Sequence, residues 1–133
     1  VLSHDDYRTW SAAPINRILA RLRVCKVPRL LFVNNVAPYL DIVRDIECEV
    51  VGVDYRADLC SVARALPGKA IQGNLDPSSL FGSVDRIVER TEKILGQFEQ
   101  PARLVFNLGH GIQPGTPVES VEAMVNTVHR FRS

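Results

Sequence analysis

The sequence predicts a parallel α/β fold built from repeated strand–helix units. Three short runs are apolar throughout and a fourth has an apolar centre, and they alternate with longer segments in which apolar residues recur at three- and four-residue steps. None of the runs alternates between apolar and polar residues, as a strand with one wet face would. A strand that is apolar throughout is typical of a parallel sheet covered on both faces, so we expect one helix followed by four strand–helix units.

The first element is an amphipathic helix over residues 3–23, with Ser3 as its cap. Pro14 lies inside this range and is expected to kink or divide the helix, because proline has no amide proton to donate. The apolar residues that recur at helical spacing and define its buried face are Tyr7, Trp10, Ile15, Ile18, Leu19 and Leu22.

Four strand–helix units follow this helix. The strands are expected at residues 30–33, 50–53, 69–72 and 104–106, and the helices after them at 38–46, 56–66, 83–98 and 116–131. Pro38 suits the first turn of its helix, and Gly73 breaks the third strand. The last helix is expected to begin at a capping box formed by Thr116 and Glu119. The residues that it is expected to bury are Val121, Met124, Val125, Val128 and Phe131.

Polar residues at the strand ends favour one of two parallel architectures. An open doubly wound sheet and half of a TIM-type (β/α)8 barrel both fit the order of elements, and in both the ligand lies beyond the carboxyl ends of the strands. Residues 34–38, after the first strand, lack the glycine fingerprint of a nucleotide-binding doubly wound sheet. We therefore favour half of a barrel, with residues 1–133 as a single partial domain. The strand-end residues expected to share one rim are Asn34, Asn35, Asp54, Gln72, Asn74, Asp76, Asn107 and His110.

Composition and charge exclude several classes of partner. The 133 residues carry 16 basic and 15 acidic side chains, so no overall field attracts nucleic acid or an anionic membrane surface. Cys25, Cys48 and Cys60 lack the paired spacing of a zinc site, and we expect reduced, buried thiols. His4 and His129 are expected on helix surfaces, and no metal-binding set emerges. No apolar run reaches the length of a membrane span and no signal-peptide pattern opens the chain, so we expect a cytoplasmic protein.

The most specific candidate site residue is His110, which lies between two glycines in the segment FNLGHGI at residues 106–112. Glycine neighbours let a ligand or another backbone approach the imidazole, and they tolerate the turn needed to aim it. A histidine in such a place acts as an acid, a base, a carboxylate-binding donor or a structural hydrogen-bonding group, and the sequence leaves these roles open. A connecting loop without a function is the alternative.

Other rim residues have mainly structural interpretations. Asp76 precedes Pro77 and is expected to cap a helix by accepting backbone N–H groups, with a catalytic carboxylate as the alternative. Asn74 is expected to tie loops together. Asp54 either pairs with Arg56, caps the next helix or reaches the pocket.

Three segments resemble the C-terminal part of the uroporphyrinogen decarboxylase family in order and in spacing. They are VVGVDYRADL at 50–59, LPGKAIQGNLDPSSLF at 66–81 and FNLGHGIQPGTPVESVEAMVNTVHRF at 106–131, and their most specific motifs are GNLDP and NLGHGI. The resemblance implies a (β/α)8 barrel of which this chain forms the C-terminal half. It also implies a homodimer that converts the acetate side chains of uroporphyrinogen to methyl groups in haem biosynthesis, giving coproporphyrinogen without a metal or an organic cofactor.

By match to NLGHGI, the resemblance implies that His110 is a catalytic and substrate-binding residue, which hydrogen-bonds a substrate carboxylate or assists proton transfer. The family's arginine-rich substrate loop, its charge-stabilising aspartate and its active-site tyrosine belong to upstream sequence. The segment NNVAP at 34–38 departs from the family pattern and predicts an altered pocket wall. We expect the chain alone to be inactive. The alternatives are a non-catalytic truncated module and a cobalamin-linked methyltransferase of the same superfamily, which would use a zinc site.

Overall fold

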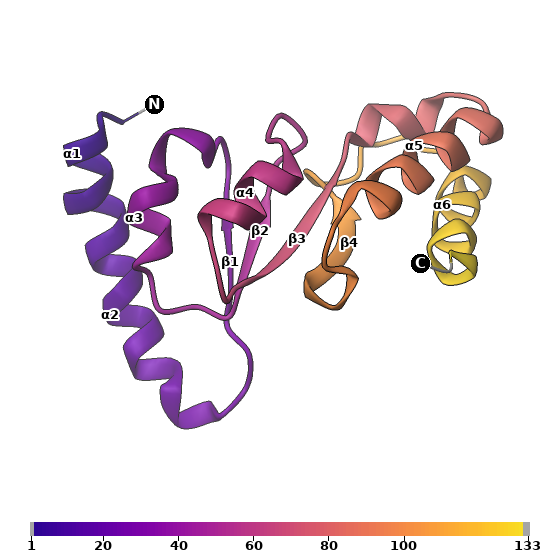
Figure 1. Cartoon of the computed structure of the whole chain (residues 1–133). Coiled ribbons are helices and arrows are strands. Elements are labelled where there is room, and N and C mark those ends of the chain that lie inside the picture. The colour runs from indigo at the N-terminus through magenta and orange to yellow at the C-terminus, as the bar shows by residue number, and fades with distance from the viewer. Residues whose placement is uncertain (1, 132–133) are drawn as a thin grey trace.

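Four parallel strands form a single sheet at the centre of the molecule (Figure 1). The computed structural model describes residues 2–131, so Val1, Arg132 and Ser133 of the expected domain lie outside the described residues. The strands are β1 (Leu30–Val33), β2 (Val50–Val53), β3 (Ala70–Leu75) and β4 (Leu104–Leu108). Each strand pairs in parallel with the next, which confirms the predicted parallel α/β fold.

The strand order separates the two architectures that the sequence left open. In a doubly wound sheet the strand order reverses, so the first strand lies inside the sheet and some consecutive strands are not neighbours. Here each strand lies beside its successor, and β1 and β4 are the two edges. This is the progression of a (β/α)8 barrel, and four such units make half of one. The predicted half-barrel arrangement is therefore confirmed.

The N-terminal helix is continuous but changes its hydrogen-bonding pattern along its length. It comprises α1 (His4–Asp6), the π-helical segment η1 (Tyr7–Ala12), α2 (Ala13–Leu22) and the 3-10 turn η2 (Arg23–Cys25). Ser3 caps it, as predicted, by accepting the Asp6 amide at 3.2 Å. Pro14 does not interrupt it, but the change from π- to α-helix falls just before this residue. The proline therefore lies in the first turn of α2, where a missing amide proton is tolerated.

Only one side of this helix is covered. Tyr7 and Leu19 lie in the core, and the Tyr7 ring stacks on Tyr39 with 4.1 Å between the ring centroids. The helix packs against residues 37–44 along that side. The apolar residues of this helix that the sequence predicts to be buried but that are exposed are Trp10, Ile18 and Leu22.

The helices after the strands are shorter than predicted. They are η3 (Ala37–Tyr39) with α3 (Leu40–Arg44), α4 (Leu59–Ala65), α5 (Val84–Gln97) and α6 (Val118–Arg130), with the 3-10 turns η4 (Pro77–Phe81) and η5 (Pro101–Arg103). Asp58 caps α4 by accepting the Ser61 amide at 2.8 Å, so this helix begins later than predicted. The capping box predicted at Thr116 does not form, because the Thr116 hydroxyl donates to the Gln113 carbonyl at 2.7 Å. Val125 of α6 is exposed rather than buried.

The strand β3 runs past Gly73, where the sequence predicts its end. Gly73 has a φ of +145°, and an added Cβ would lie 2.9 Å from the Val53 carbonyl oxygen of β2. Glycine adopts this conformation at little steric cost and fits against β2. The strand therefore continues to Leu75 and carries Asn74 to the carboxyl edge of the sheet.

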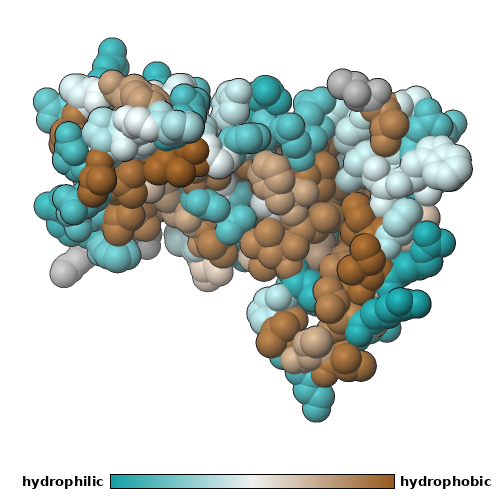
Figure 2. Space-filling view, turned by 180° about the vertical axis from the view of Figure 1, so that it is seen from behind, coloured by the Kyte–Doolittle hydropathy of each residue, from teal (hydrophilic) through white to brown (hydrophobic). Residues whose placement is uncertain are grey.

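The two faces of the sheet differ in burial. The side chains that point toward the helices and pack in the core include Val33, Val51, Val53 and Ile71. On the opposite face, Leu30, Phe32 and Val105 are 46%, 45% and 44% exposed. We call this side, defined by these three residues, the uncovered face. The molecule seen from behind shows hydrophobic residues gathered across its centre (Figure 2). The prediction of strands buried on both faces is thus wrong for the described residues.

Cationic side chains tie together the amino ends of the strands. Lys69 Nζ donates to the carbonyls of Ile46 at 2.6 Å and Cys48 at 3.1 Å. Arg103 donates to the Leu66 carbonyl at 2.9 Å and, through Nε, to the Lys69 carbonyl at 2.9 Å. The segments that lead into β2, β3 and β4 are therefore joined by charge-assisted hydrogen bonds to main-chain oxygens.

Arg29 and Glu49 connect the first two strands to the N-terminal helix. Arg29 Nη2 lies 2.6 Å from Glu49 Oε1, and Arg29 Nη1 donates to the Leu19 carbonyl at 3.0 Å. The side-chain hydrogen bond from Arg29 lowers the pKa of Glu49 to about 2. The carboxylate of Glu49 is therefore charged throughout the neutral and mildly acidic range.

Two predictions from composition concern the cysteines and membrane spans. Cys48 is buried, as predicted, and burial raises the pKa of its thiol. Cys60 is partly buried, but Cys25 is exposed, contrary to the prediction, because it lies at the end of the N-terminal helix that is covered on one side only. In the part of the chain that the structure describes, no helix combines the length and apolar character needed to cross a bilayer.

Candidate functional site

The carboxyl ends of the four strands carry the loops on which the predicted site residues lie. His110 follows β4 by two residues and lines a depression of about 540 Å³ at the rim of the uncovered face. The structure brings three predicted rim residues, Gln72, Asn107 and His110, into this one depression. The residues that line it are Phe32, Val53, Gln72, Asn107, Leu108, His110, Gly111 and Ile112.

The side chains of Phe32 and Gln72 lie on either side of Gly52. The parallel register aligns Phe32 of β1 with Gly52 of β2 and Gln72 of β3. A Cβ at Gly52 would lie 3.0 Å from Gln72 Oε1 and 3.1 Å from Phe32 Cδ2, so the glycine leaves room for both side chains. Sequence reasoning missed Phe32 as a lining residue. Alternation along the strand places Phe32 on the same face as Leu30, but its alignment with Gln72 comes from the register between the strands.

The glycine before His110 has a structural reason. Gly109 donates its amide to the Leu75 carbonyl at 2.8 Å. A Cβ added at Gly109 would lie 2.7 Å from Cα of Tyr55 and 2.8 Å from its Cβ, which is closer than any real side chain approaches. At Gly111, by contrast, an added Cβ would meet nothing within 4 Å. The sequence predicts that these glycines either allow a ligand or another backbone to approach or permit a tight turn. Gly109 allows the backbone of Tyr55 to approach.

The imidazole of His110 has no protein partner among residues 2–131. It is exposed, and its ring forms no hydrogen bond or ion pair with another described residue. A structural hydrogen-bonding role is therefore not what holds this residue in place. Both nitrogens are available to a ligand, one as a donor and the other as an acceptor in the neutral ring.

Asp54 is a structural carboxylate at the end of β2. It is 1% exposed, and its Oδ1 accepts the Arg56 amide at 2.9 Å, while Oδ2 accepts the Asn35 amide. It does not cap the next helix, because Asp58 does so. The carboxylate lies 4.0 Å from the Arg56 guanidinium. Asp54 therefore contacts Arg56, as predicted, but mainly through the main-chain amide of Arg56. The carboxylate thus joins the loops after β1 and β2.

Asn74 and Asp76 have the structural roles that the sequence predicts. Asn74 Nδ2 donates to the carbonyls of Asp54 at 3.0 Å and Ala57 at 2.7 Å, which ties β3 to the loop after β2. Asp76 caps η4 by accepting the Ser78 amide at 2.9 Å. Neither side chain lines the depression beside His110.

The other two histidines lie away from the depression. His4 pairs with Asp41 at 2.9 Å, and this hydrogen bond lowers the pKa of Asp41. His129 is exposed on α6. Both are on the surface, as predicted. Over residues 2–131, no three His, Cys, Asp or Glu side chains cluster in a way that would hold a metal ion.

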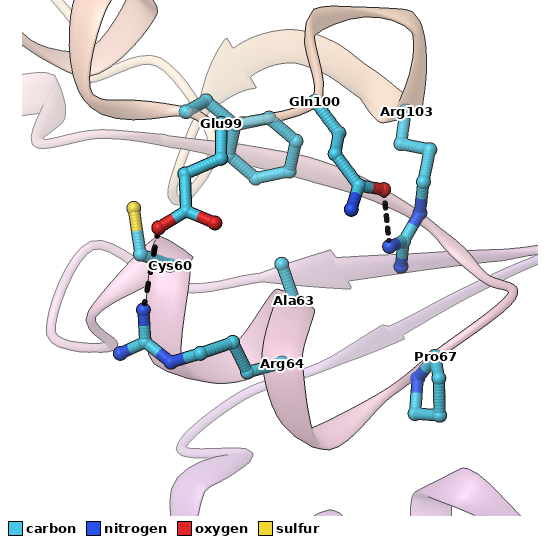
Figure 3. Close-up of a pocket in the computed structure, with 8 residues that line it drawn as sticks. Cys60, Ala63, Arg64, Pro67, Glu99, Gln100 and Arg103 are labelled. Atoms are coloured by element: carbon cyan, nitrogen blue, oxygen red, sulfur yellow. Dashed lines mark hydrogen bonds and ion pairs between the residues drawn. The ribbon is translucent and has the colours of Figure 1, made fainter.

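A second depression, of about 210 Å³, lies between α4 and the segment that follows α5 (Figure 3). Arg64 faces Glu99 at 4.0 Å across it, and Arg103 donates to Gln100 at 2.8 Å. The thiol of Cys60 donates to a main-chain carbonyl at 3.1 Å. These groups bond to one another rather than converge on a common point. The depression beside His110 is therefore the better candidate.

The chain is similar to known decarboxylases along almost its whole length. Residues 1–131 match the family model described as uroporphyrinogen decarboxylase (URO-D). The uroporphyrinogen decarboxylase of Verminephrobacter eiseniae is 37% identical over 151 aligned residues, which cover 98% of this chain and 40% of that protein. The corresponding protein of Saccharophagus degradans is 40% identical, with 96% and 37% covered. The chain thus spans about 40% of the length of the relatives that it matches.

A solved structure shares the arrangement of strands and helices. A methyltransferase from Methanosarcina mazei superposes with a TM-score of 0.83 over 100% of this chain and 39% of its own. The two sequences are 23% identical, so this likeness concerns the fold alone. The family match over residues 1–131 and the curated relatives concern the sequence itself. The chain belongs to the uroporphyrinogen decarboxylase family.

Proposed function

We propose that this chain supplies the last four strand–helix units of a uroporphyrinogen decarboxylase and that His110 contacts the tetrapyrrole substrate. The observation that carries the proposal is the unpartnered imidazole of His110, within NLGHGI, beside an apolar depression at the carboxyl ends of the strands. In a barrel this end of the strands holds the active site. The membership of the family supplies the reaction class, decarboxylation.

The lining of the depression suits a tetrapyrrole with carboxylate arms. Phe32, Leu108 and Ile112 offer apolar surface to the pyrrole rings, and burial of such surface is favourable. Gln72 and Asn107 offer amide donors, and His110 offers an imidazole donor, for carboxylate oxygens. Apolar surface with a few polar groups is the usual composition of a small-molecule site.

The chemistry that we propose for His110 concerns a proton or a carboxylate. When carbon dioxide leaves an acetate arm, the protonated pyrrole accepts the electron pair of the broken carbon–carbon bond. A proton then adds to the methylene carbon to give the methyl group, and the ring loses its extra proton, so that each arm exchanges carbon dioxide for one proton. A histidine beside the arm either donates a hydrogen bond to its carboxylate or delivers that proton. The carboxylate that stabilises the protonated pyrrole is proposed to come from the remaining units of the barrel.

We propose that the chain is inactive by itself. The uncovered face and the edge strands β1 and β4 present apolar side chains and unpaired main-chain groups, which the first half of the barrel would cover. We also propose that the complete enzyme is a cytoplasmic homodimer that needs no metal or organic cofactor. The non-catalytic module and the zinc-dependent methyltransferase are the alternatives.

The test is reconstitution. The purified chain is mixed with the N-terminal portion of the Saccharophagus degradans decarboxylase, and coproporphyrinogen is measured after addition of uroporphyrinogen. We expect no product from either part alone, product from the mixture, and a loss of roughly 100-fold with His110→Ala if the imidazole transfers a proton. The matched control is His129→Ala, on the exposed side of α6. Turnover by the chain alone, or a mixture indifferent to His110→Ala, would count against the proposal. Stoichiometric bound zinc would favour the methyltransferase.

A further inference from the structure

Arg56 lies on the loop after β2, next to the loop that carries His110. The contact between these loops is direct, because Gly109 packs against the backbone of Tyr55, the residue before Arg56. His110 directly follows Gly109, and Arg56 directly follows Tyr55. The contact therefore places the two residues on adjoining loops of the same rim.

The guanidinium of Arg56 is held by neutral groups from two loops. Its central carbon lies 5.0 Å from the centroid of the Tyr55 ring, within the range of a cation–π interaction. Its Nη1 lies 3.4 Å from Asn34 Oδ1, and its Nη2 lies 3.4 Å from the Tyr55 hydroxyl. These long contacts orient the planar group without saturating its donors.

Within residues 2–131, the ion pair that this arginine forms is a long one. Its partner is Asp54, at 4.0 Å, and both oxygens of Asp54 already accept main-chain amides. Arg29 provides a contrast, since it binds Glu49 at 2.6 Å. The Arg56 side chain is 57% exposed, so its positive charge faces the solvent beside the rim.

We infer that Arg56 is a carboxylate-binding residue of the site and that it holds one carboxylate arm of the substrate while His110 contacts another. This inference rests on the proposed function for its choice of ligand. The residue types fit, because a guanidinium binds carboxylate with paired hydrogen bonds. Asn34 and Tyr55, which orient the guanidinium, act as positioning residues.

The experiment uses two anionic probes and measures their dissociation constants for the chain by titration calorimetry. Uroporphyrin, the stable oxidised form of the substrate, carries the carboxylate arms on a tetrapyrrole. Mellitate, a benzene polycarboxylate, carries carboxylates alone. The variants are Arg56→Gln, which keeps hydrogen-bonding capacity but removes the charge, and Arg56→Lys, which keeps the charge but loses the paired geometry. The matched control is Arg64→Gln, an exposed arginine near the amino ends of the strands that lies 4.0 Å from Glu99 and donates to the Ser61 hydroxyl at 3.0 Å.

We expect Arg56→Gln to weaken the binding of both probes by about threefold to tenfold, Arg56→Lys to weaken it less, and Arg64→Gln to leave it unchanged. The charge on Arg56 also predicts that Arg56→Gln reduces the salt dependence of binding. Equal affinities for wild type and Arg56→Gln with both probes would overturn the inference and leave the proposed function standing. Binding of mellitate that depends on Arg56, without binding of uroporphyrin, would uphold the carboxylate site and count against the tetrapyrrole. Failure to bind either probe would overturn both.

Discussion

Gly109 lies so close to Tyr55 that a Cβ at Gly109 would come within 2.7 Å of Cα of Tyr55. The glycine thus has a second function besides freeing the turn before His110. It locks the loop after β4 against the loop after β2 through main-chain contact. Because main-chain contact has no rotamers, the separation of the two loops is set by the backbone.

The first prediction compares the two glycines on either side of His110. We expect Gly109→Ala to lower the free energy of unfolding by about 2–3 kcal/mol, because the methyl group must displace the Tyr55 backbone. Gly111→Ala, where an added Cβ meets nothing within 4 Å, is expected to change stability by less than about 0.5 kcal/mol. Urea unfolding followed by circular dichroism measures both. Equal midpoints for the two variants would show that the loops separate at little cost.

The second prediction concerns the amide that ties β3 to the loop after β2. Asn74→Ala leaves the carbonyls of Asp54 and Ala57 without their side-chain donor, and we expect a loss of about 2–3 kcal/mol of stability. Asn107→Ala is the control, since the Asn107 amide oxygen accepts only the amide of its neighbour Leu108 among the described residues. Thermal unfolding of both variants tests this. A control as unstable as Asn74→Ala would contradict the assignment.

The third prediction is a pH dependence from Glu49. The pKa of this carboxyl falls from its ordinary 4.5 to about 2 in the folded chain, where Arg29 donates to it. A lowered folded pKa contributes stability that is fully present above pH 4.5 and is lost as the pH falls toward 2. Wild type should therefore be more stable than Glu49→Gln at pH 7, with a difference that shrinks below pH 4.5. Urea midpoints at several pH values measure it, and a difference that does not vary with pH would argue against the Arg29 contact.

The fourth prediction tests the uncovered face. We expect the double variant Phe32→Ser, Val105→Ser to bind less of a hydrophobic dye and to self-associate less than wild type, because it removes exposed apolar surface. The control is Val24→Ser, which removes an 82% exposed valine from the 3-10 turn η2. Sedimentation velocity at matched concentration and folded fraction gives the comparison. If Val24→Ser has the larger effect, the surface responsible for self-association lies at the N-terminal helix instead.

The sequence predicts the strands better than the helix faces. Apart from Lys69, the residues predicted as strands lie within the observed strands. Apolar runs of this kind are typical of parallel strands, although one face of this sheet is uncovered. Trp10 and Ile18 show the opposite case: helical spacing places an apolar residue on a helix, but which partner covers it depends on residues elsewhere. The sequence predicts that Gly73 ends the strand, whereas the positive φ of this glycine lets the strand continue.

For the site, the sequence locates His110 and its rim but not its surroundings. Strand-end position is a local property, so Gln72, Asn107 and His110 could be placed together from the pattern alone. The part played by Arg56 depends on how two loops approach each other in space. That approach follows from a tertiary contact, which no local pattern of the sequence records.

The bonds from Lys69 and Arg103 end on main-chain oxygens, and this bears on how the chain tolerates mutation. A carbonyl oxygen is common to every residue type, so positions 46, 48 and 66 can change identity without removing the acceptor. Two cationic side chains thus secure the amino ends of the strands almost independently of their neighbours. Substitutions at the opposite rim, which carries the proposed site, then leave these hydrogen bonds in place.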